Sequence, residues 1–207
     1  VDGFRRSFQY FETVYIVQES GMPYGASLLT SLRILYHYTG RADHATFVAG
    51  IYPEWKLIAP VLVGAVAAIV IIARTPAWCR LMTVACALMV FSPNTGMYRG
   101  AVLIVPIAMW ILDVRSRDGN FSLSHAEWLL AATAGAGLAP LTFWTVTGFE
   151  MKYITSQSLV AAFVYAALGI LAIVVGLQRT GRLRTRSGVS KHQSAARTLS
   201  AHGIHTP

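Results

Sequence analysis

The sequence predicts an all-α, polytopic integral membrane protein with about five transmembrane helices. Five apolar stretches joined by short connections lie between Leu57 and Leu177. Hydrophobic residues make up 55% of the 207 residues and charged residues only 13%, which leaves little polar surface for a soluble domain of this size. The basic residues also alternate between connections, as the positive-inside rule requires of a multi-pass protein.

Residues 1–56 precede the first apolar stretch and are predicted to lie outside, at the membrane interface. Aromatic side chains recur at intervals of three and four from Phe4 to Tyr15, which indicates an amphipathic helix. The segment from Tyr24 to Tyr38 is apolar but only 15 residues long, too short to span. It is therefore predicted to form a re-entrant or interfacial helix with a single formal charge, Arg33.

The first and last apolar stretches are the strongest predictions of membrane spans. Neither Leu57–Ala73 nor Leu159–Leu177 contains a charged residue, and each is long enough as a helix to cross most of a hydrocarbon core. The absence of an ionisable group from both also disfavours proton-coupled transport.

The three stretches between them are weaker predictions, because two are short and the third contains Gly135, Gly137 and Pro140. The turn-forming sequence around Pro93 would join the second and third spans tightly. The alternative is a single broken or re-entrant element. Its free backbone N–H and C=O groups must then form hydrogen bonds with protein or water. The predicted spans are residues 57–74, 76–93, 97–113, 128–146 and 159–177.

The distribution of basic residues predicts the orientation of these spans. Ten of the seventeen lysines and arginines fall on one side, which is therefore predicted to be cytoplasmic, with the carboxy terminus. Residues 178–207 carry six basic and no acidic residues, and they are predicted to be a disordered tail attracted to anionic membrane lipids. No folded basic module for nucleic-acid binding is visible.

Cysteine and histidine positions give no sign of a metal site or of another identifiable cofactor. Cys79 and Cys86 lie in or beside the second span, where we expect them to pack in the core. His37 and His44 are seven residues apart beside Asp43, but Gly40 intervenes and no third ligand has the proper spacing.

The order of features resembles the carboxy-terminal half of glycosyltransferase family 87. Ser27-Leu28 and Arg33 are followed by a span, by basic residues, and by a second span that ends in Ser92-Pro93 before a short outside loop and a third span. The family usually has Trp and then His or Tyr soon after the serine-proline pair, whereas this chain has Tyr98 and no Trp. The resemblance covers about residues 24–112.

This family comprises GT-C fold membrane enzymes, among them the polyprenol-phosphate-mannose-dependent mannosyltransferases of actinobacteria. The resemblance implies transfer of a sugar, with mannose as the candidate, from a polyprenyl-phosphate donor to a glycan or glycolipid acceptor on the outer face of the plasma membrane. The general base of such enzymes lies in the first outside loop, so we expect it upstream of this chain, which would then be a fragment. Among the outside acids present, Glu54 is the candidate.

Basic residues on the predicted outer face are candidate ligands for the phosphate of a lipid carrier. Arg33, Lys56 and Arg99 run against the positive-inside bias there, as does Lys152, and the planar guanidinium matches phosphate oxygens. Ser27 and Tyr98 belong to the same candidate substrate site, and Trp55 could stack on a sugar ring. The alternative interpretation is solvated basic residues beside an aromatic belt at the headgroup level.

Two other function classes fit the hydropathy pattern. One is a non-enzymatic transporter or assembly subunit whose spans bind partner helices. The other is a polysaccharide polymerase, in which outside arginines hold a lipid-linked glycan. A polymerase would extend chains of repeating units rather than add single sugars.

Overall fold

The computed structural model describes residues 27–39, 44–92, 97–116, 123–138, 145–146, 154–155 and 160–181, together with Gly3, Arg6, Ser7, Gln9 and Tyr10. Helices make up nearly all the regular structure of these residues, with one two-residue ladder and short turns between the helices, so the predicted all-α class is confirmed. The helices are α2 (Leu28–Tyr38), α3 (His44–Ile72), α4 (Ala77–Phe91), the 3-10 helix η3 (Met97–Leu103), α5 (Ile104–Arg115), α6 (His125–Leu138) and a carboxy-terminal helix (Val160–Gly181); β1 (Thr145–Val146) pairs antiparallel with β2 (Ile154–Thr155).

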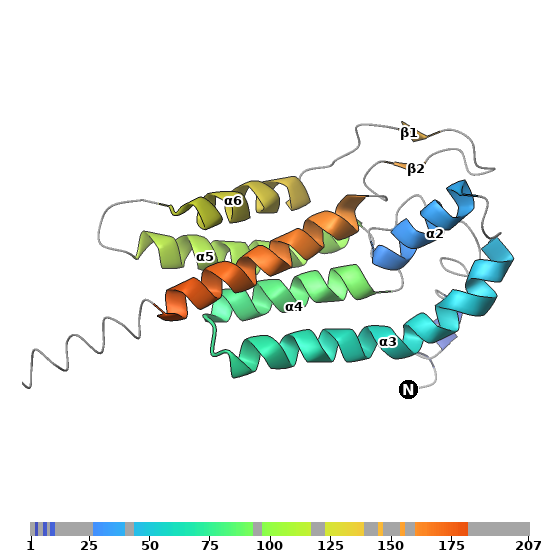
Figure 1. Cartoon of the computed structure of the whole chain (residues 1–207), viewed down its shortest axis with the longest axis horizontal. Helices are drawn as coiled ribbons and strands as arrows, with labels where there is room; N and C mark the ends of the chain where they lie inside the picture. Colours follow the sequence, from blue (N-terminus) through green and yellow to red (C-terminus); the bar gives the residue numbers. More distant parts are fainter. Residues whose placement is uncertain are drawn as a thin grey trace, which may run out of the picture.

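The longer helices run side by side as a bundle in which sequence neighbours alternate in direction (Figure 1). Helix α4 contacts α3, α5 and η3, and α2 packs on both α3 and α4. One end of the bundle, here called the arginine end, carries Arg74, Arg80 and Arg115, all exposed, and Arg179. The opposite end, with α2 and the two short strands, is called the α2 end (Figure 1).

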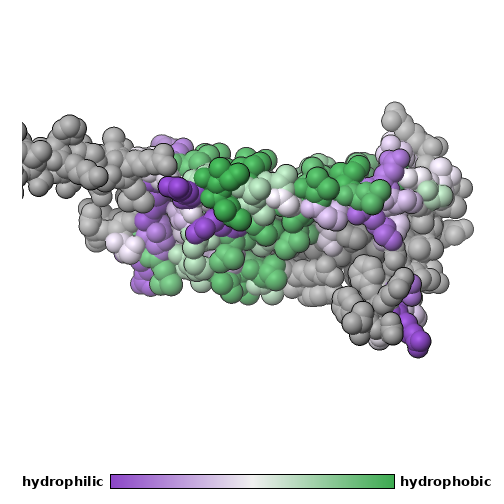
Figure 2. All heavy atoms as spheres, turned by 90° about the horizontal axis from the view of Figure 1, so that it is seen from below, coloured by the Kyte–Doolittle hydropathy of each residue, from purple (hydrophilic) through white to green (hydrophobic). Residues whose placement is uncertain are grey.

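Two helices among the described residues are long and apolar enough to cross a membrane. They are Ala49–Ile72 of α3 and Val160–Gly181, whereas α4 is a shorter apolar helix. Apolar side chains point outward along α3, with Leu57 76% and Ile72 79% exposed. Figure 2 shows a hydrophobic belt between hydrophilic groups at the two ends of the molecule. Exposed apolar surface of this kind is typical of a face that contacts a membrane or another protein.

The larger hydrophobic core of the bundle includes residues of α4, α5, α6 and the carboxy-terminal helix. Trp78 of α4 and Trp110 of α5 are both buried, with ring centroids 6.4 Å apart. Tyr165 of the last helix is buried against Gly137, whose carbonyl accepts a 3.3 Å hydrogen bond from the tyrosine hydroxyl. The small residue therefore lets α6 approach the last helix closely.

Helix α4 packs against the carboxy-terminal helix through two pairs of residues spaced by seven. Cys79 lies against Gly176, and Cys86 lies against Gly169 one heptad away. A Cβ at Gly176 would be 2.5 Å from the Cys79 sulfur, and a Cβ at Gly169 would be 3.2 Å from the Cys86 Cβ. The Cys79 thiol also donates to the Ala172 carbonyl at 3.1 Å. The expected role of both cysteines in packing is thus confirmed, and small residues at a close helix crossing explain it.

Local interactions define the ends of two helices at the arginine end. Glu127 is buried and accepts hydrogen bonds from the Ser124 backbone N–H and hydroxyl, both at 2.9 Å, and its own N–H bonds to the Ser124 Oγ at 3.4 Å. This reciprocal capping box starts α6. Asp113 of α5 forms an ion pair with Arg179 of the last helix, so the two helices are joined where they end.

The structure corrects three predicted boundaries. Helix α3 starts at His44, so the helix that contains the predicted first span begins well before residue 57. Pro53 and Pro60 lie inside α3, and the helix bends toward its amino-terminal end instead of stopping (Figure 1). The tail predicted to begin at residue 178 is helical as far as Gly181, where the Asp113 ion pair holds Arg179.

The predicted fourth span, residues 128–146, is also wrong at its carboxyl end. Helix α6 is described only to Leu138, and Thr145 and Val146 form β1. Gly135 and Gly137 weaken the helix in this region, and the β-branched Thr145 and Val146 suit a strand. Of the amphipathic helix predicted from Phe4 to Tyr15, the structure describes only Arg6, Ser7, Gln9 and Tyr10, which are helical and exposed. Residues 182–207 of the tail fall outside the described residues.

Replacing Gly176 by alanine is expected to destabilise the bundle, because the new Cβ would collide with the Cys79 sulfur. Overpacking of this kind costs about 1–3 kcal/mol. Thermal unfolding of the purified protein in detergent measures the effect, with Gly135→Ala as control, since a Cβ there meets nothing within 4 Å. Adding Cys79→Ala should recover part of the loss; equal stability of Gly176→Ala and the parent would contradict this packing.

Candidate functional site

An apolar groove of about 840 Å³ runs between α3 and α4 in the half of the bundle nearer α2. Its walls are residues of α3 between Tyr52 and Gly64 and residues of α4 between Ala85 and Phe91, with Ser92 and Val102. The volume lies within the range of pockets that bind small molecules, about 300–1,000 Å³. Lys56 and Ser92 are the polar residues of the lining, and they place its polar end toward α2.

Small residues and proline leave space along the α3 wall of the groove. Ala59, Pro60 and Gly64 supply much of the α3 wall, and a Cβ at Gly64 would meet nothing within 4 Å. Toward the arginine end α3 meets α4 again, where the buried Val70 accepts a 3.1 Å hydrogen bond from the Thr75 hydroxyl in the connecting turn. The helices are thus joined at both ends of the groove and separated in between.

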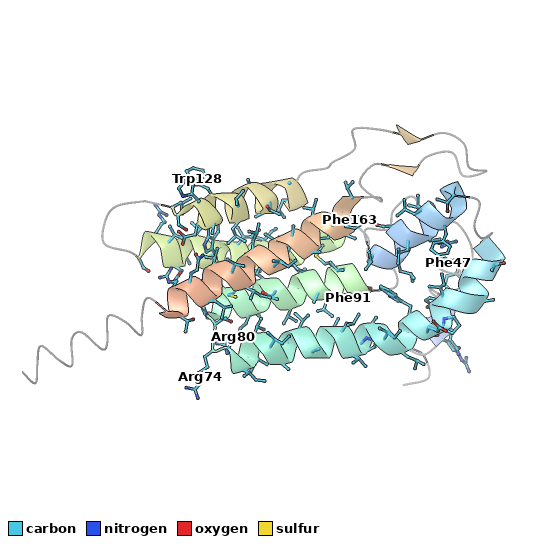
Figure 3. The ribbon with its side chains drawn as sticks, in the orientation of Figure 1. Phe47, Arg74, Arg80, Phe91, Trp128 and Phe163 are labelled. Atoms are coloured by element: carbon cyan, nitrogen blue, oxygen red, sulfur yellow. The ribbon has the colours of Figure 1, made fainter. Side chains whose placement is uncertain are left out.

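Trp55 joins the helices at the α2 end of the groove. Its indole N–H donates a 3.0 Å hydrogen bond to the carbonyl of Phe91, and the two ring centroids are 6.3 Å apart. Figure 3 shows Phe91 at the end of α4 that faces this part of α3. The Phe91 carbonyl belongs to the last turn of α4, where no later helical N–H reaches it, so Trp55 satisfies an end-of-helix acceptor.

Lys56 and Glu54 flank Trp55 in sequence, and both are exposed. The Lys56 ammonium lies 5.3 Å from the centroid of the Tyr52 ring one turn earlier, within the range of a cation–π interaction. Lys56 therefore stands at the polar end of the groove. Trp55 is half-buried against Phe91. The predicted stacking on a sugar ring would therefore have to use the part of the indole ring that stays exposed.

A second hydrophobic cluster, here called the cap cluster, lies at the α2 end. Leu29 of α2 and Phe47 and Tyr52 of α3 are buried in it. Tyr36 meets Phe47 edge to face, with centroids 6.0 Å apart and an interplanar angle of 64°. The amino-terminal part of α3 thus belongs to the cap cluster, and its later part lines the groove.

Ser27 begins α2 and is fully buried. Its hydroxyl accepts a 3.3 Å hydrogen bond from the Thr30 backbone N–H, and its carbonyl accepts 3.0 and 3.2 Å bonds from the Ser31 N–H and hydroxyl. This is the geometry of a helix N-cap. The structure therefore gives Ser27, predicted as a substrate ligand, a role in starting the helix that carries Arg33.

Arg33 is the buried cationic residue of α2, with only 8% of its side chain surface exposed. It follows the capped first turn, in a helix packed against both α3 and α4. Burial of a guanidinium is costly without an anion or several hydrogen-bond acceptors close to it. Of the predicted phosphate ligands, Arg33 and Lys56 come from neighbouring elements, α2 and α3.

The remaining predicted ligands cannot be placed in this way. Tyr98 and Arg99 belong to η3, whose backbone contacts α4 and α5, but their side chains are outside the described part of the structure. Lys152 and the side chains of His37, Asp43 and His44 are also outside it. Within the residues that are described, no group of three metal-binding side chains occurs.

Sequence analysis missed the groove and the residues that shape it. Gly64 and Pro60 looked like ordinary members of an apolar span, and Phe91 like the end of the next one. The spacing of Ala59, Pro60 and Gly64 marks a small-residue side of α3 and could have indicated a close approach or a gap. Which of the two occurs depends on how α4 packs.

Comparison of the chain with models of protein families, with curated proteins and with solved structures finds no match. The groove, the cap cluster and Arg33 are therefore the features from which a function can be inferred.

Replacing Trp55 by phenylalanine is expected to loosen the α2 end of the groove while keeping an aromatic ring in place. Loss of the hydrogen bond to the Phe91 carbonyl should lower the unfolding free energy by about 1 kcal/mol. Chemical or thermal unfolding in detergent measures this, with Trp128→Phe as the matched control because Trp128 is exposed on α6 (Figure 3). Equal losses in both variants would show that the Trp55 bond contributes nothing specific.

Proposed function

We propose that the chain is part of a membrane glycosyltransferase that takes a sugar, with mannose as the candidate, from a polyprenyl-phosphate donor. The acceptor is a glycan or glycolipid on the outer face of the plasma membrane. The observation that carries the proposal is the buried Arg33 on α2, a helix too short to span a bilayer and packed at one end of an apolar bundle. A guanidinium held there suits a lipid-borne phosphodiester.

The proposal includes five spans, formed by α3, α4, η3 with α5, α6, and the carboxy-terminal helix. Their alternating directions and the arrangement of Arg74, Arg80, Arg115 and Arg179 at one end support it (Figure 1). In this topology the arginine end is cytoplasmic and the α2 end is extracytoplasmic. Short helices can cross as members of a bundle because neighbouring helices shield their ends.

Chemistry at such a site consists of holding the phosphate as leaving group while a carboxylate removes the acceptor proton. In this proposal Arg33 holds the phosphate. Glu54 is exposed on the same turn of α3 as Lys56, which keeps it available to acceptor hydroxyls.

Replacing Arg33 in the whole protein tests the proposal. Arg33→Gln should lower sugar transfer from a polyprenyl-phosphate donor in isolated membranes by about 10- to 100-fold, since a charged hydrogen bond contributes about 1.5–3 kcal/mol. Arg33→Lys should retain part of the activity, because lysine keeps the charge but loses the planar fork. Full activity in Arg33→Gln would remove this residue from the site.

The control for this experiment is Arg80→Gln, an exposed arginine at the opposite end of the bundle. Protein abundance in the membrane and detergent unfolding are measured in parallel. Loss of transfer with normal abundance in Arg33→Gln, and none in Arg80→Gln, separates a binding defect from a folding defect. A polymerase is distinguished by products that grow in repeating units.

The proposed sidedness is tested by labelling engineered cysteines in intact cells. An impermeant maleimide should react with Glu54→Cys from outside, and with Ser116→Cys only after the cells are permeabilised, because the two exposed positions lie at opposite ends of the bundle. The parent protein is the control, since Cys79 and Cys86 are buried. Labelling of Glu54→Cys from the cytosolic side alone would invert the topology.

A further inference from the structure

We propose that the groove between α3 and α4 binds an acyl chain of an anionic phospholipid from the extracytoplasmic leaflet, with the phosphate beside Lys56. This lipid is a resident of the bilayer and is distinct from the polyprenyl-phosphate donor. The inference uses the membrane placement given under the proposed function, but it requires no sugar transfer.

The chemistry of the lining fits a hydrocarbon chain with a charged head at one end. The wall along Ala59, Val63, Ala85 and Leu88 is apolar, whereas Lys56 and Ser92 lie toward the α2 end. A basic residue at the headgroup level attracts anionic lipid, and the indole of Trp55 suits the same interface. Charge and hydropathy therefore change along the groove in the same direction as along a phospholipid.

The length of the groove selects one leaflet. On α3 it extends from Tyr52 to Gly64, which is about 18 Å of helix at 1.5 Å per residue. Half of a typical hydrocarbon core is about 15 Å. On α4 the groove ends at Ala85, in the middle of the helix. Closer to the arginine end, the hydrogen bond from Thr75 to the Val70 carbonyl lies where α3 packs against the bundle again. An acyl chain matches this depth, whereas a polyprenyl chain is much longer than one leaflet.

The lipid would enter from the side. Leu57 and Val61 of α3, next to the groove on the same helix, are 76% and 68% exposed, so the surface around the opening is itself apolar. A chain bound there would continue the contacts that α3 makes with surrounding lipid. It would also fill the space that Gly64 leaves and so brace α3 against α4.

Photo-crosslinking tests the inference on the full chain reconstituted in phosphatidylcholine vesicles. The probe is phosphatidylglycerol with a diazirine in its acyl chain, and labelled peptides are mapped by mass spectrometry. Labels are expected on the groove walls, in residues 59–64 and 85–89. Gly64→Leu should lower labelling of the groove walls at least about fourfold, because each buried methylene lost changes affinity by about that factor. Ala68→Leu is the matched control, since Ala68 is exposed on α3 outside the groove.

Lys56→Gln tests the headgroup assignment. The preference for phosphatidylglycerol over a phosphatidylcholine probe should fall about fivefold, the effect of one basic residue near an anionic headgroup. Two results would overturn the inference. One is labelling spread evenly over outward residues such as Ile69 and Ile72 and unchanged by Gly64→Leu, which would indicate surrounding lipid only. The other is displacement of the probe by an equimolar amount of polyprenyl phosphate, which would assign the groove to the donor.

These outcomes are separate from those of the functional test. Arg33 lies on α2 and does not line the groove, and crosslinking reads no enzymatic product. A protein that labels in the groove but transfers no sugar would keep the lipid site and lose the glycosyltransferase. Maleimide labelling of the Glu54→Cys and Ser116→Cys variants establishes independently which leaflet the groove faces.

Discussion

The close approach of α4 to the carboxy-terminal helix is the contact on which the rest of the bundle depends. Two glycines, Gly169 and Gly176, leave room for Cys86 and Cys79 in successive heptads, so the two helices pack in close van der Waals contact. With α4 fixed in this way, α5 and α6 complete the core through Trp110 and Tyr165. Helix α3 stays at the edge, where most of its surface faces outward.

The peripheral position of α3 produces both features of the candidate site. Its amino-terminal part leaves the line of the bundle and packs with α2 in the cap cluster, and its middle part diverges from α4 to form the groove. Trp55 stands between the two parts and ties them to the end of α4 through the Phe91 carbonyl. A single hydrogen bond thus holds α3, against which α2 packs, to the end of α4 at the polar end of the groove.

A buried arginine and an apolar groove at the same end of a bundle have separate physical requirements. Arg33 is a buried charge with at least one interaction partner within the protein, which lowers the cost of its burial. The groove is lined mainly by apolar side chains, which suit hydrocarbon better than water. Phosphate groups and acyl chains adjoin at a membrane interface, so both proposed ligands would be present there. This common setting connects the proposed donor site with the proposed resident lipid.

The sequence alone determined the helical class and the two helices that are long and apolar enough to cross a membrane, because long charge-free apolar runs satisfy their backbone groups as helices. It also identified the cysteines as packing residues and Arg33 as an unusual charge. It could not determine that α3 begins at His44, since Pro53 and Pro60 permit a bend as readily as a stop, nor that Thr145 and Val146 pair with Ile154 and Thr155. The groove was decided only by tertiary structure: the same small residues produce contact or a gap according to where the neighbouring helix lies.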